Sequence, residues 1–285
     1  MRVGNPAPPM PREPLRQPLP MQVLLAEDDV INQQVITFML EADGHRVDVA
    51  ADGRAAVERA AAKRYDVVLM DCEMPVMDGL AATRAIRGNE ARRNTGERVA
   101  IVALTGRDTD ADRAACRDAG MTGFLAKPVT PDDLAAALAV AAGGATGPAP
   151  VARAAAPIGT RPAFDRSLIA AMPMIADGSD PGFATELVAV FSNRARRLLA
   201  DLAAAASAGD RDAMVRCVHT MKSSSAMIGA LALSDRARDC EVRLRAGEPP
   251  LPGWIERLHD DFARFETAVA AYLATMPGTP GTTPR

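Results

Sequence analysis

The sequence has few histidines and few cysteines, and the cysteines follow no metal-binding pattern. Only three histidines and four cysteines occur among the 285 residues. The cysteines stand at positions 72, 116, 217 and 240, which form no CxxC motif or other metal-ligand pair. This spacing favours neither a cysteine-ligated metal site nor a disulfide framework, so we expect a reducing compartment.

Long apolar runs, a secretory signal and an excess of positive charge are also absent. A hydrophobic content of 48% and a charged content of 24% are typical of a soluble globular protein. The net charge of −3 gives no electrostatic reason to expect a nucleic-acid partner. No apolar run approaches the roughly 20 residues that span a bilayer, and residues 1–20 are proline-rich without a hydrophobic segment. We therefore expect a cytoplasmic protein with no membrane insertion.

Short apolar runs alternate with segments of helical spacing between residues 21 and 143. The runs are QVLLA, RVDV, DVVLM, VAIVAL and GFLA, which begin at residues 22, 46, 66, 99 and 123. Helical spacing falls approximately at 30–42, 54–64, 79–88, 109–119 and 131–142. Because buried strands separated by helices form a parallel sheet covered on both faces, we predict a five-stranded, doubly wound α/β domain. Its functional residues should lie at the carboxyl ends of the strands.

After this domain the pattern changes to helices only. Residues 1–20, 144–163 and 277–285 are rich in proline and glycine, and we expect a disordered N-terminus, a flexible linker and a disordered tail. Between the last two, over 164–276, helical spacing falls at about 180–206, 211–228, 231–246 and 254–275. The first of these opens on Asp180 as N-cap and Pro181 at N1. Four amphipathic helices joined by short turns predict an all-α, antiparallel four-helix bundle.

Polar residues follow four of the predicted strands. Glu27, Asp28 and Asp29 follow the first, Asp71 the third, Thr105 closes the fourth, and Lys127-Pro128 closes the fifth. The carboxyl ends of parallel strands meet at one edge, so these groups should converge. Crowded carboxylates need a cation, and oxygen ligands suit Mg²⁺. Each acid could instead merely cap a helix, but four such features in this order argue against that reading.

These motifs, with MDCEMPVMDG around Asp71, resemble the receiver domains of two-component response regulators over about residues 21–143. The resemblance implies that Asp71 is the phosphoacceptor and that Mg²⁺ is bound by Glu27, Asp28, Asp71 and the backbone carbonyl of Glu73. It implies that Lys127 pairs with a phosphoryl oxygen and precedes a cis peptide bond. It also makes Thr105 the switch hydroxyl and Phe124 the aromatic residue that follows it.

Three neighbouring positions bear on how the pocket works. Gly106 stands where alanine is usual in receivers, which predicts a more open pocket. Glu73 and Arg107 occupy positions that often set how water reaches the phosphoryl group, so substituting either should change the lifetime of a phosphoaspartate.

The stretch VHTMKSSSAMIGA contains His219. Helical spacing places this histidine opposite an apolar stripe, with Lys222 and Ser223 beside it at i+3 and i+4. An exposed histidine is usually incidental, but HTMKSSSAMIGA resembles the active segment of histidine-phosphotransfer (HPt) domains, over about residues 164–276. The resemblance implies a phosphohistidine at His219, Lys222 as a solvated cation that offsets its charge, and Ser223 where glycine is most usual. We assign His45 and His259 to structure or surface.

We interpret the chain as a phosphorelay protein, with a sensor histidine kinase upstream and a response regulator receiver downstream. Its layout resembles the C-terminal end of hybrid sensor histidine kinases, and no Gly-rich ATP-binding region is present. We therefore expect a non-enzymatic relay protein whose own chemistry is Mg²⁺-dependent phosphorylation and dephosphorylation at Asp71. Two alternatives are a phosphorylation-gated binding module with the bundle as a phosphate sink, and an aspartate-nucleophile phosphatase. The haloacid-dehalogenase type of phosphatase needs a second aspartate at position 73, where this chain has Glu73.

Overall fold

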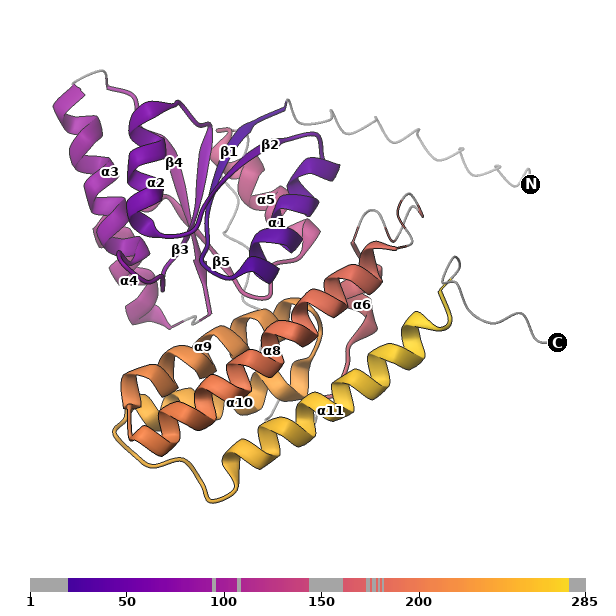
Figure 1. Cartoon of the computed structure of the whole chain (residues 1–285). Helices are drawn as coiled ribbons and strands as arrows, with labels where there is room; N and C mark the ends of the chain where they lie inside the picture. The colour runs from indigo at the N-terminus through magenta and orange to yellow at the C-terminus, as the bar shows by residue number, and fades with distance from the viewer. Residues whose placement is uncertain are drawn as a thin grey trace, which may run out of the picture.

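The computed structural model describes residues 20–93, 96–106, 109–143, 161–172, 175, 178, 180 and 182–276. Within these residues the chain forms a sheet domain with helices on both faces and a helical domain that lies against it (Figure 1). The expected disordered N-terminus and tail, most of the expected linker, and residues Arg107 and Pro181 lie outside the described residues.

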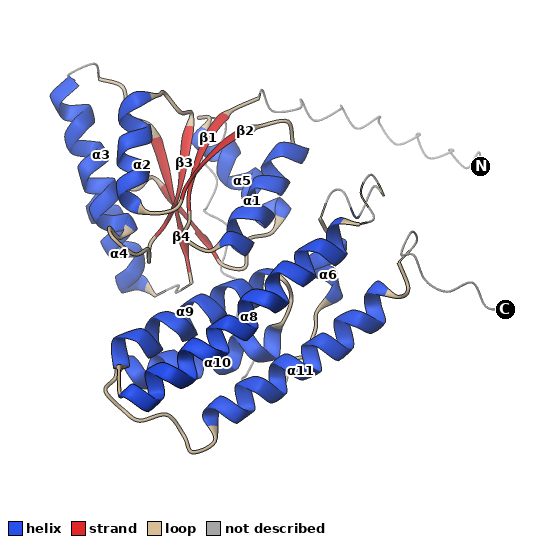
Figure 2. Cartoon of the chain, viewed as in Figure 1, coloured by secondary structure: helices blue, strands red, loops and turns tan. Residues whose placement is uncertain are grey.

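The first domain is a parallel five-stranded sheet in the order β2-β1-β3-β4-β5. The strands are β1 (Gln22–Ala26), β2 (Arg46–Ala50), β3 (Val67–Asp71), β4 (Ala100–Thr105) and β5 (Gly123–Ala126). The helices are α1 (Val30–Ala42), α2 (Gly53–Ala62), α3 (Gly79–Arg93), α4 (Asp110–Ala119) and α5 (Pro131–Ala141). Figure 2 shows the sheet between these helices, and the predicted doubly wound α/β class is confirmed.

Alternate residues of the central strands supply two separate cores. In β1, Val23 and Leu25 pack with α1 and α5, whereas Leu24 and Ala26 pack with the helices of the other face. The same division holds along β3 and β4 because side chains of a strand point alternately to opposite faces. Every residue of β3 is buried, which explains why its sequence is a continuous apolar run ending in Asp71.

The second domain is a bundle of antiparallel helices. Its elements are α6 (Arg166–Ala170), α8 (Phe183–Ala208), α9 (Arg211–Met227), α10 (Leu231–Arg245) and α11 (Trp254–Leu273). The four long helices confirm the predicted bundle, and α6 was not predicted because five residues show no helical periodicity. Helix α8 begins at Phe183 rather than at 180, while the Asp180 carboxylate accepts hydrogen bonds from the backbone N–H groups of Gly182 and Phe183.

The two domains share an apolar contact. Helix α1 packs against α8 and α9, and the ring of Phe38 stacks on that of Phe183 with centroids 4.1 Å apart. Nearby, the backbone N–H of Val129 points at the sulfur of Met227 at 3.4 Å. The core on the α1 and α5 face of the sheet thus continues into the bundle without a break.

Candidate functional site

Three carboxylates and one lysine meet at the carboxyl edge of the sheet. Glu27 and Asp28 follow β1, Asp71 is the last residue of β3, and Lys127 follows β5. The Lys127 ammonium donates to Glu27 Oε2 and to Asp71 Oδ2, each at 2.7 Å. The convergence predicted from the strand order is therefore present, and Glu27, Asp71 and the lysine side chain are all buried.

The charge of this cluster is not balanced by the lysine alone. Burial, and then the charge of Asp71, raise the pKa of Glu27 well above its ordinary value, and the same two causes raise the pKa of Asp28 to about 6. Burial lowers the pKa of Lys127, but Asp71 and Glu27 together raise it further than burial lowers it. Three carboxylates beside one ammonium carry excess negative charge when all are ionised, and burial and this repulsion together favour protonation of Glu27 and Asp28.

The oxygen donors of this cluster fit a small divalent cation. Carboxylate oxygens of Glu27, Asp28 and Asp71 lie within 4.8 Å of one another. A hard ion such as Mg²⁺ takes oxygen ligands of this kind, and its charge would counter the repulsion from Asp71 that, after burial, raises the two pKa values.

Thr105 and Phe124 lie on neighbouring strands beside this cluster. Thr105 ends β4 and is buried, and its backbone carbonyl accepts a hydrogen bond from the N–H of Lys127 at 2.8 Å. Phe124 lies in β5, where the guanidinium of Arg113 sits 4.3 Å from the ring centroid. The peptide bond between Lys127 and Pro128 is cis, as predicted.

Asp29 and Glu73 make contacts with the bundle that the sequence did not indicate. Asp29 caps α1 by accepting from the N–H groups of Ile31 and Asn32, so for this residue the capping alternative holds. Its second oxygen pairs with Arg194 of α8 at 3.1 Å. The side chain of Glu73 points away from the sheet and contacts residues at the surface of the bundle.

His219 lies on α9, at the surface of the bundle that meets the sheet domain. Its Nδ1 atom is 2.9 Å from Glu241 Oε1 on α10 and 3.3 Å from Glu73 Oε2 of the sheet domain. Arg245, one turn after Glu241, pairs with both glutamates. The imidazole is therefore held between the two domains, with its side chain 17% exposed.

The expectation that Lys222 is a solvated cation is wrong. Lys222 is 4% exposed, and its Nζ atom lies 2.6 Å from Glu241 Oε2 and 3.4 Å from His219 Nδ1. The reason is that α10 supplies a carboxylate within reach, while the sheet domain covers this part of α9. A helical wheel of α9 alone contains neither neighbour.

Glu241 determines which ring nitrogen of His219 carries the proton. Burial raises the pKa of Glu241, but the hydrogen bond with His219 and the Lys222 ammonium outweigh burial and hold that pKa well below its ordinary value. An ionised carboxylate can only accept, so we assign the proton to Nδ1. The unshared pair of His219 then lies on Nε2, the nitrogen free to act as a nucleophile.

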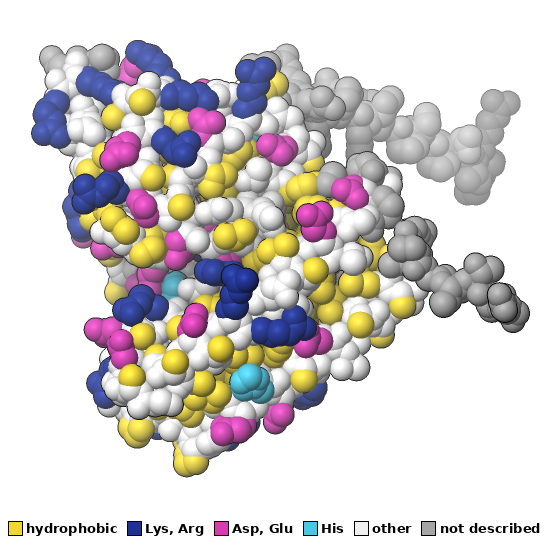
Figure 3. Space-filling model, in the orientation of Figure 1, with side chains coloured by type: hydrophobic (Ala, Val, Ile, Leu, Met, Phe, Trp, Pro, Cys, Tyr) yellow, Lys and Arg dark blue, Asp and Glu magenta, His cyan; other side chains and the backbone are white. Residues whose placement is uncertain are grey.

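Both groups of residues line one cleft between the domains. Its volume is about 690 Å³, and its walls include Asp71, Thr105 and Lys127 from the sheet domain and His219, Lys222 and Ser223 from the bundle. The cleft lies on the boundary between the sheet domain and the bundle, which we call the seam. Charged side chains of both signs gather along it, with a histidine among them (Figure 3). Sequence reasoning missed Glu241 and Arg245, although their i, i+4 spacing of opposite charges was visible.

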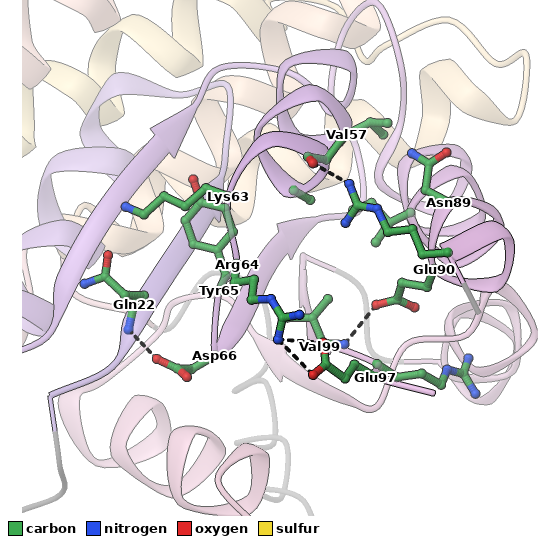
Figure 4. A pocket seen from close by; sticks show the side chains of 15 residues that line it. Gln22, Val57, Lys63, Arg64, Tyr65, Asp66, Asn89, Glu90, Glu97 and Val99 are labelled. Atoms are coloured by element: carbon green, nitrogen blue, oxygen red, sulfur yellow. Dashed lines mark hydrogen bonds and ion pairs between the residues drawn. The ribbon is translucent and has the colours of Figure 1, made fainter. Parts of the chain in front are cut away.

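A second cavity, of about 540 Å³, lies at the opposite edge of the sheet (Figure 4). Its charged side chains are largely engaged with one another: Arg64 pairs with Glu97 at 2.7 Å, and Asp66 accepts from the N–H of Gln22 at 2.6 Å. The carboxylate of Glu90 accepts from the N–H of Val99 at 2.9 Å. We see structural ion pairs here and no reactive group.

The two other histidines behave as predicted. His45 is buried and accepts a hydrogen bond from the N–H of Met21 at 3.2 Å, whereas His259 is exposed on α11. Among the described residues, no helix has the combination of length and apolar character that crossing a membrane requires.

Comparison with known families identifies two matches along the chain. Residues 23–139 match the response regulator receiver domain, and residues 186–268 match the Hpt domain. Together the two models cover more than half of the chain. Hybrid signal transduction histidine kinase B of Dictyostelium discoideum is 38% identical over 120 residues, which are 40% of this chain and 6% of that protein. The chain thus spans only a small part of the hybrid kinases that it matches.

Among the solved structures that are similar to part of the chain, two contain receiver domains of signalling proteins. The receiver domain of sensor histidine kinase PA1611 from Pseudomonas aeruginosa PAO1, solved with a magnesium ion in its active-site cleft, is 45% identical. The alignment has a TM-score of 0.40 and covers 44% of this chain and 98% of that one. A chain in the complex of Saccharomyces cerevisiae Ypd1 with the receiver domain of Ssk1 is 28% identical, with a TM-score of 0.41, and the match covers 42% and 87% of the two chains.

Proposed function

The chain carries a response regulator receiver domain followed by an Hpt domain, and from this premise we propose how it takes part in phosphorelay signalling. Asp71 accepts a phosphoryl group from a sensor histidine kinase, and His219 carries a phosphoryl group toward a downstream response regulator. The observation that supports this proposal best is that Asp71 and His219 line the same cleft.

At the receiver, the chain supplies a nucleophile and most of the charge that phosphoryl transfer needs. The Asp71 carboxylate attacks phosphorus as the N–P bond of the kinase phosphohistidine breaks and its electron pair returns to that imidazole. The Lys127 ammonium, already 2.7 Å from Asp71, stabilises the negative charge that spreads over the phosphoryl oxygens. We propose Mg²⁺ as the cofactor, held by Glu27, Asp28, Asp71 and the backbone carbonyl of Glu73. When bound, the ion neutralises charge on the transferring group.

The phosphorylated receiver must then signal through its surface. In our proposal the Thr105 hydroxyl turns toward the new phosphoryl group, and Phe124, on the next strand, follows it. An ordered hydroxyl beside a covalent phosphate biases a two-state surface, which is how a local charge change reaches a partner.

In the Hpt domain, we propose that Nε2 of His219 is the phosphoryl acceptor. Glu241 fixes the tautomer through Nδ1, and its ion pair with Lys222 keeps a positive charge within 3.4 Å of the ring. The Lys222 ammonium can therefore offset the negative charge of a phosphohistidine although the lysine is buried.

The experiment is phosphotransfer from a phosphorylated sensor kinase to wild type, Asp71→Asn and His219→Gln. Wild type should first carry acid-stable label, which marks the acyl phosphate at Asp71, and then base-stable label, which marks the phosphohistidine at His219. Asp71→Asn should accept nothing from the kinase, and His219→Gln should hold label on Asp71. Label that stays on Asp71 and never reaches any histidine or downstream receiver would defeat the relay and favour a phosphorylation-gated binding module.

A further inference from the structure

We propose that the receiver domain of the same chain is the partner that docks on His219, so that the phosphoryl group passes from Asp71 to His219 within one molecule. This inference rests on the proposed function and adds the identity of the partner. It is carried by three sets of contacts across the seam, each made by side chains distant in sequence.

The first contact joins Ser223 to the carboxylate cluster. Asn32 of α1 donates through its Nδ2 to Glu27 Oε1 at 2.7 Å and to Ser223 Oγ at 2.8 Å. All three residues are buried. Glycine, the usual residue at position 223 in Hpt domains, has no side-chain oxygen to accept this hydrogen bond from Asn32. The hydroxyl therefore gives this Hpt domain a specific, desolvated bond to its own receiver.

The second contact explains the glycine at position 106. A Cβ atom added to Gly106 would lie 3.2 Å from Nζ and 3.3 Å from Cε of Lys222. Lys222, which is paired with Glu241, would have to move by a few tenths of an ångström to accommodate that atom. Glycine at this position thus makes room for the lysine of the docked bundle. The two departures from the usual family residues, Gly106 and Ser223, lie at one interface.

The third set of contacts consists of ion pairs, and in each of them the acidic residue lies in the receiver and the basic residue in the bundle. The receiver contributes Asp29 and Glu73, and the bundle contributes Arg194 and Arg245 as their partners. Glu73 also approaches His219 Nδ1 at 3.3 Å. Complementary charges of this kind fix orientation and suppress wrong partners more than they add affinity. They set the two domains in the register that puts Asp71 and His219 in one cleft.

The transfer itself balances within these residues. The Nε2 lone pair of His219 forms the new N–P bond, and the bond between phosphorus and the Asp71 oxygen breaks with its electron pair returning to the carboxylate. Lys127 stays paired with that carboxylate. The Nδ1 proton remains on the ring, where the Glu241 carboxylate stabilises the positive charge that the imidazole acquires. No further reactant is needed.

Covalent connection makes such a transfer first order. A tethered partner is present at an effective concentration on the order of millimolar, far above the concentration of free chains in a dilute assay. Intramolecular transfer should therefore not slow on dilution, whereas transfer between chains should slow in proportion.

The primary test loads Asp71 with radiolabelled acetyl phosphate and follows label to His219 in the full chain. Wild type should transfer at a rate that stays constant over about a hundredfold dilution. A mixture of His219→Gln, which carries label on Asp71, and Asp71→Asn, which offers His219, should transfer more slowly and in proportion to concentration. Equal rates in the mixture and in wild type, both falling on dilution, overturn the inference but leave the proposed function intact. Label that never reaches His219 by either route overturns both.

Three interface variants make the test specific. Arg194→Glu should lower the rate of Asp71-to-His219 transfer about fivefold by turning an ion pair into a repulsion, and Gly106→Ala and Ser223→Gly should lower it about two- to fivefold. Arg197→Glu makes the same charge change at an exposed position of α8 and should leave the rate unchanged. Loading of Asp71 by acetyl phosphate, measured in parallel, separates a docking defect from a damaged receiver.

Amide hydrogen exchange gives a readout independent of phosphate. Protection of α1 should fall in Arg194→Glu but not in Arg197→Glu, because α1 packs on α8 and α9 only in the docked state. Unchanged exchange and unchanged transfer in all three interface variants would overturn the inference.

Discussion

Lys127→Met is the substitution whose effect can be worked out most fully from the geometry. It keeps an unbranched side chain of nearly the same length and removes the charge from between Glu27 and Asp71. The variant should be markedly less stable than wild type without Mg²⁺, and Mg²⁺ should restore more stability to the variant than it adds to wild type.

The magnitude follows from the distances. At 2.7 Å, a lysine and a carboxylate attract by about 6 kcal/mol at an effective dielectric constant of about 20. Desolvation of the buried groups offsets much of this, and removing one partner of a buried pair typically costs about 3–5 kcal/mol. That is a large share of the roughly 5–15 kcal/mol that stabilises a domain. Burial and Asp71 already raise the pKa of Glu27 to about 8, and loss of the lysine, which lowers that pKa, should raise it further.

The assay is urea unfolding at pH 7, with and without Mg²⁺, followed by circular dichroism and by tryptophan fluorescence. The chain has one tryptophan, Trp254, at the start of α11, so fluorescence reports the bundle and circular dichroism reports both domains. Adding Asp71→Asn to Lys127→Met should recover part of the lost stability, because it removes a carboxylate that has lost its cation. Equal unfolding free energies for Lys127→Met and wild type without Mg²⁺, or equal gains on adding Mg²⁺, would refute this account of the cluster.

Three further predictions concern the glutamates near His219. Glu241→Ala should slow phosphorylation of His219 about tenfold by releasing the ring tautomer, and Glu241→Gln, which keeps an oxygen acceptor, should retain more of the rate; equal losses would argue against positioning through Nδ1. Because the pKa of Glu241 is lowered on folding, its stabilising charge is fully present above its ordinary pKa of 4.5 and is lost as the pH falls through the lower folded value. The difference in unfolding free energy between wild type and Glu241→Gln should therefore be constant near neutrality and shrink in acid; a difference that grows in acid would contradict the assignment. Glu73→Ala should change the lifetime of the phosphoaspartate, measured as decay of acid-stable label, and unaltered decay would exclude a role for this side chain in water access.

The strands and the carboxylate cluster could be predicted from sequence because their causes are local. A strand buried on both faces is a continuous apolar run, and β3 ends where that run meets Asp71. Helix ends were less accurate: the helix predicted to stop at Gly88 continues to Arg93 as α3, with a Cβ at Gly88 meeting nothing closer than 4.0 Å. A glycine inside a helix, such as the partly buried Gly88, costs only about 1 kcal/mol relative to alanine, which the rest of the helix can offset.

The environment of His219 could not be predicted because it comes from other elements. Glu241 reaches the ring from α10, and Glu73 reaches it from a loop 146 positions earlier in the chain. Periodicity within α9 identifies the side of the helix but not what covers that side. For the same reason the sequence predicted a solvated Lys222, and it could not show that Lys222 lies next to Gly106.

In the proposed relay, the interface between the two domains must also open. His219 is only 17% exposed when docked, so a second receiver can reach it only after the first has left. With a tethered partner at an effective concentration on the order of millimolar, the isolated domains need a dissociation constant near millimolar for the chain to be open about half of the time. The Arg245–Glu73 pair suits this requirement, because both side chains are more than 30% exposed and an exposed ion pair contributes only about 0–1 kcal/mol. Arg194 is also more than 30% exposed, although its partner Asp29 is buried. Buried Ser223 and close-fitting Gly106 supply specificity with few atoms. Strengthening the seam, for example by enlarging its apolar contact at Phe183, should therefore speed transfer to His219 and slow transfer from His219 to a downstream receiver, and an increase in both rates would show that opening does not limit the relay.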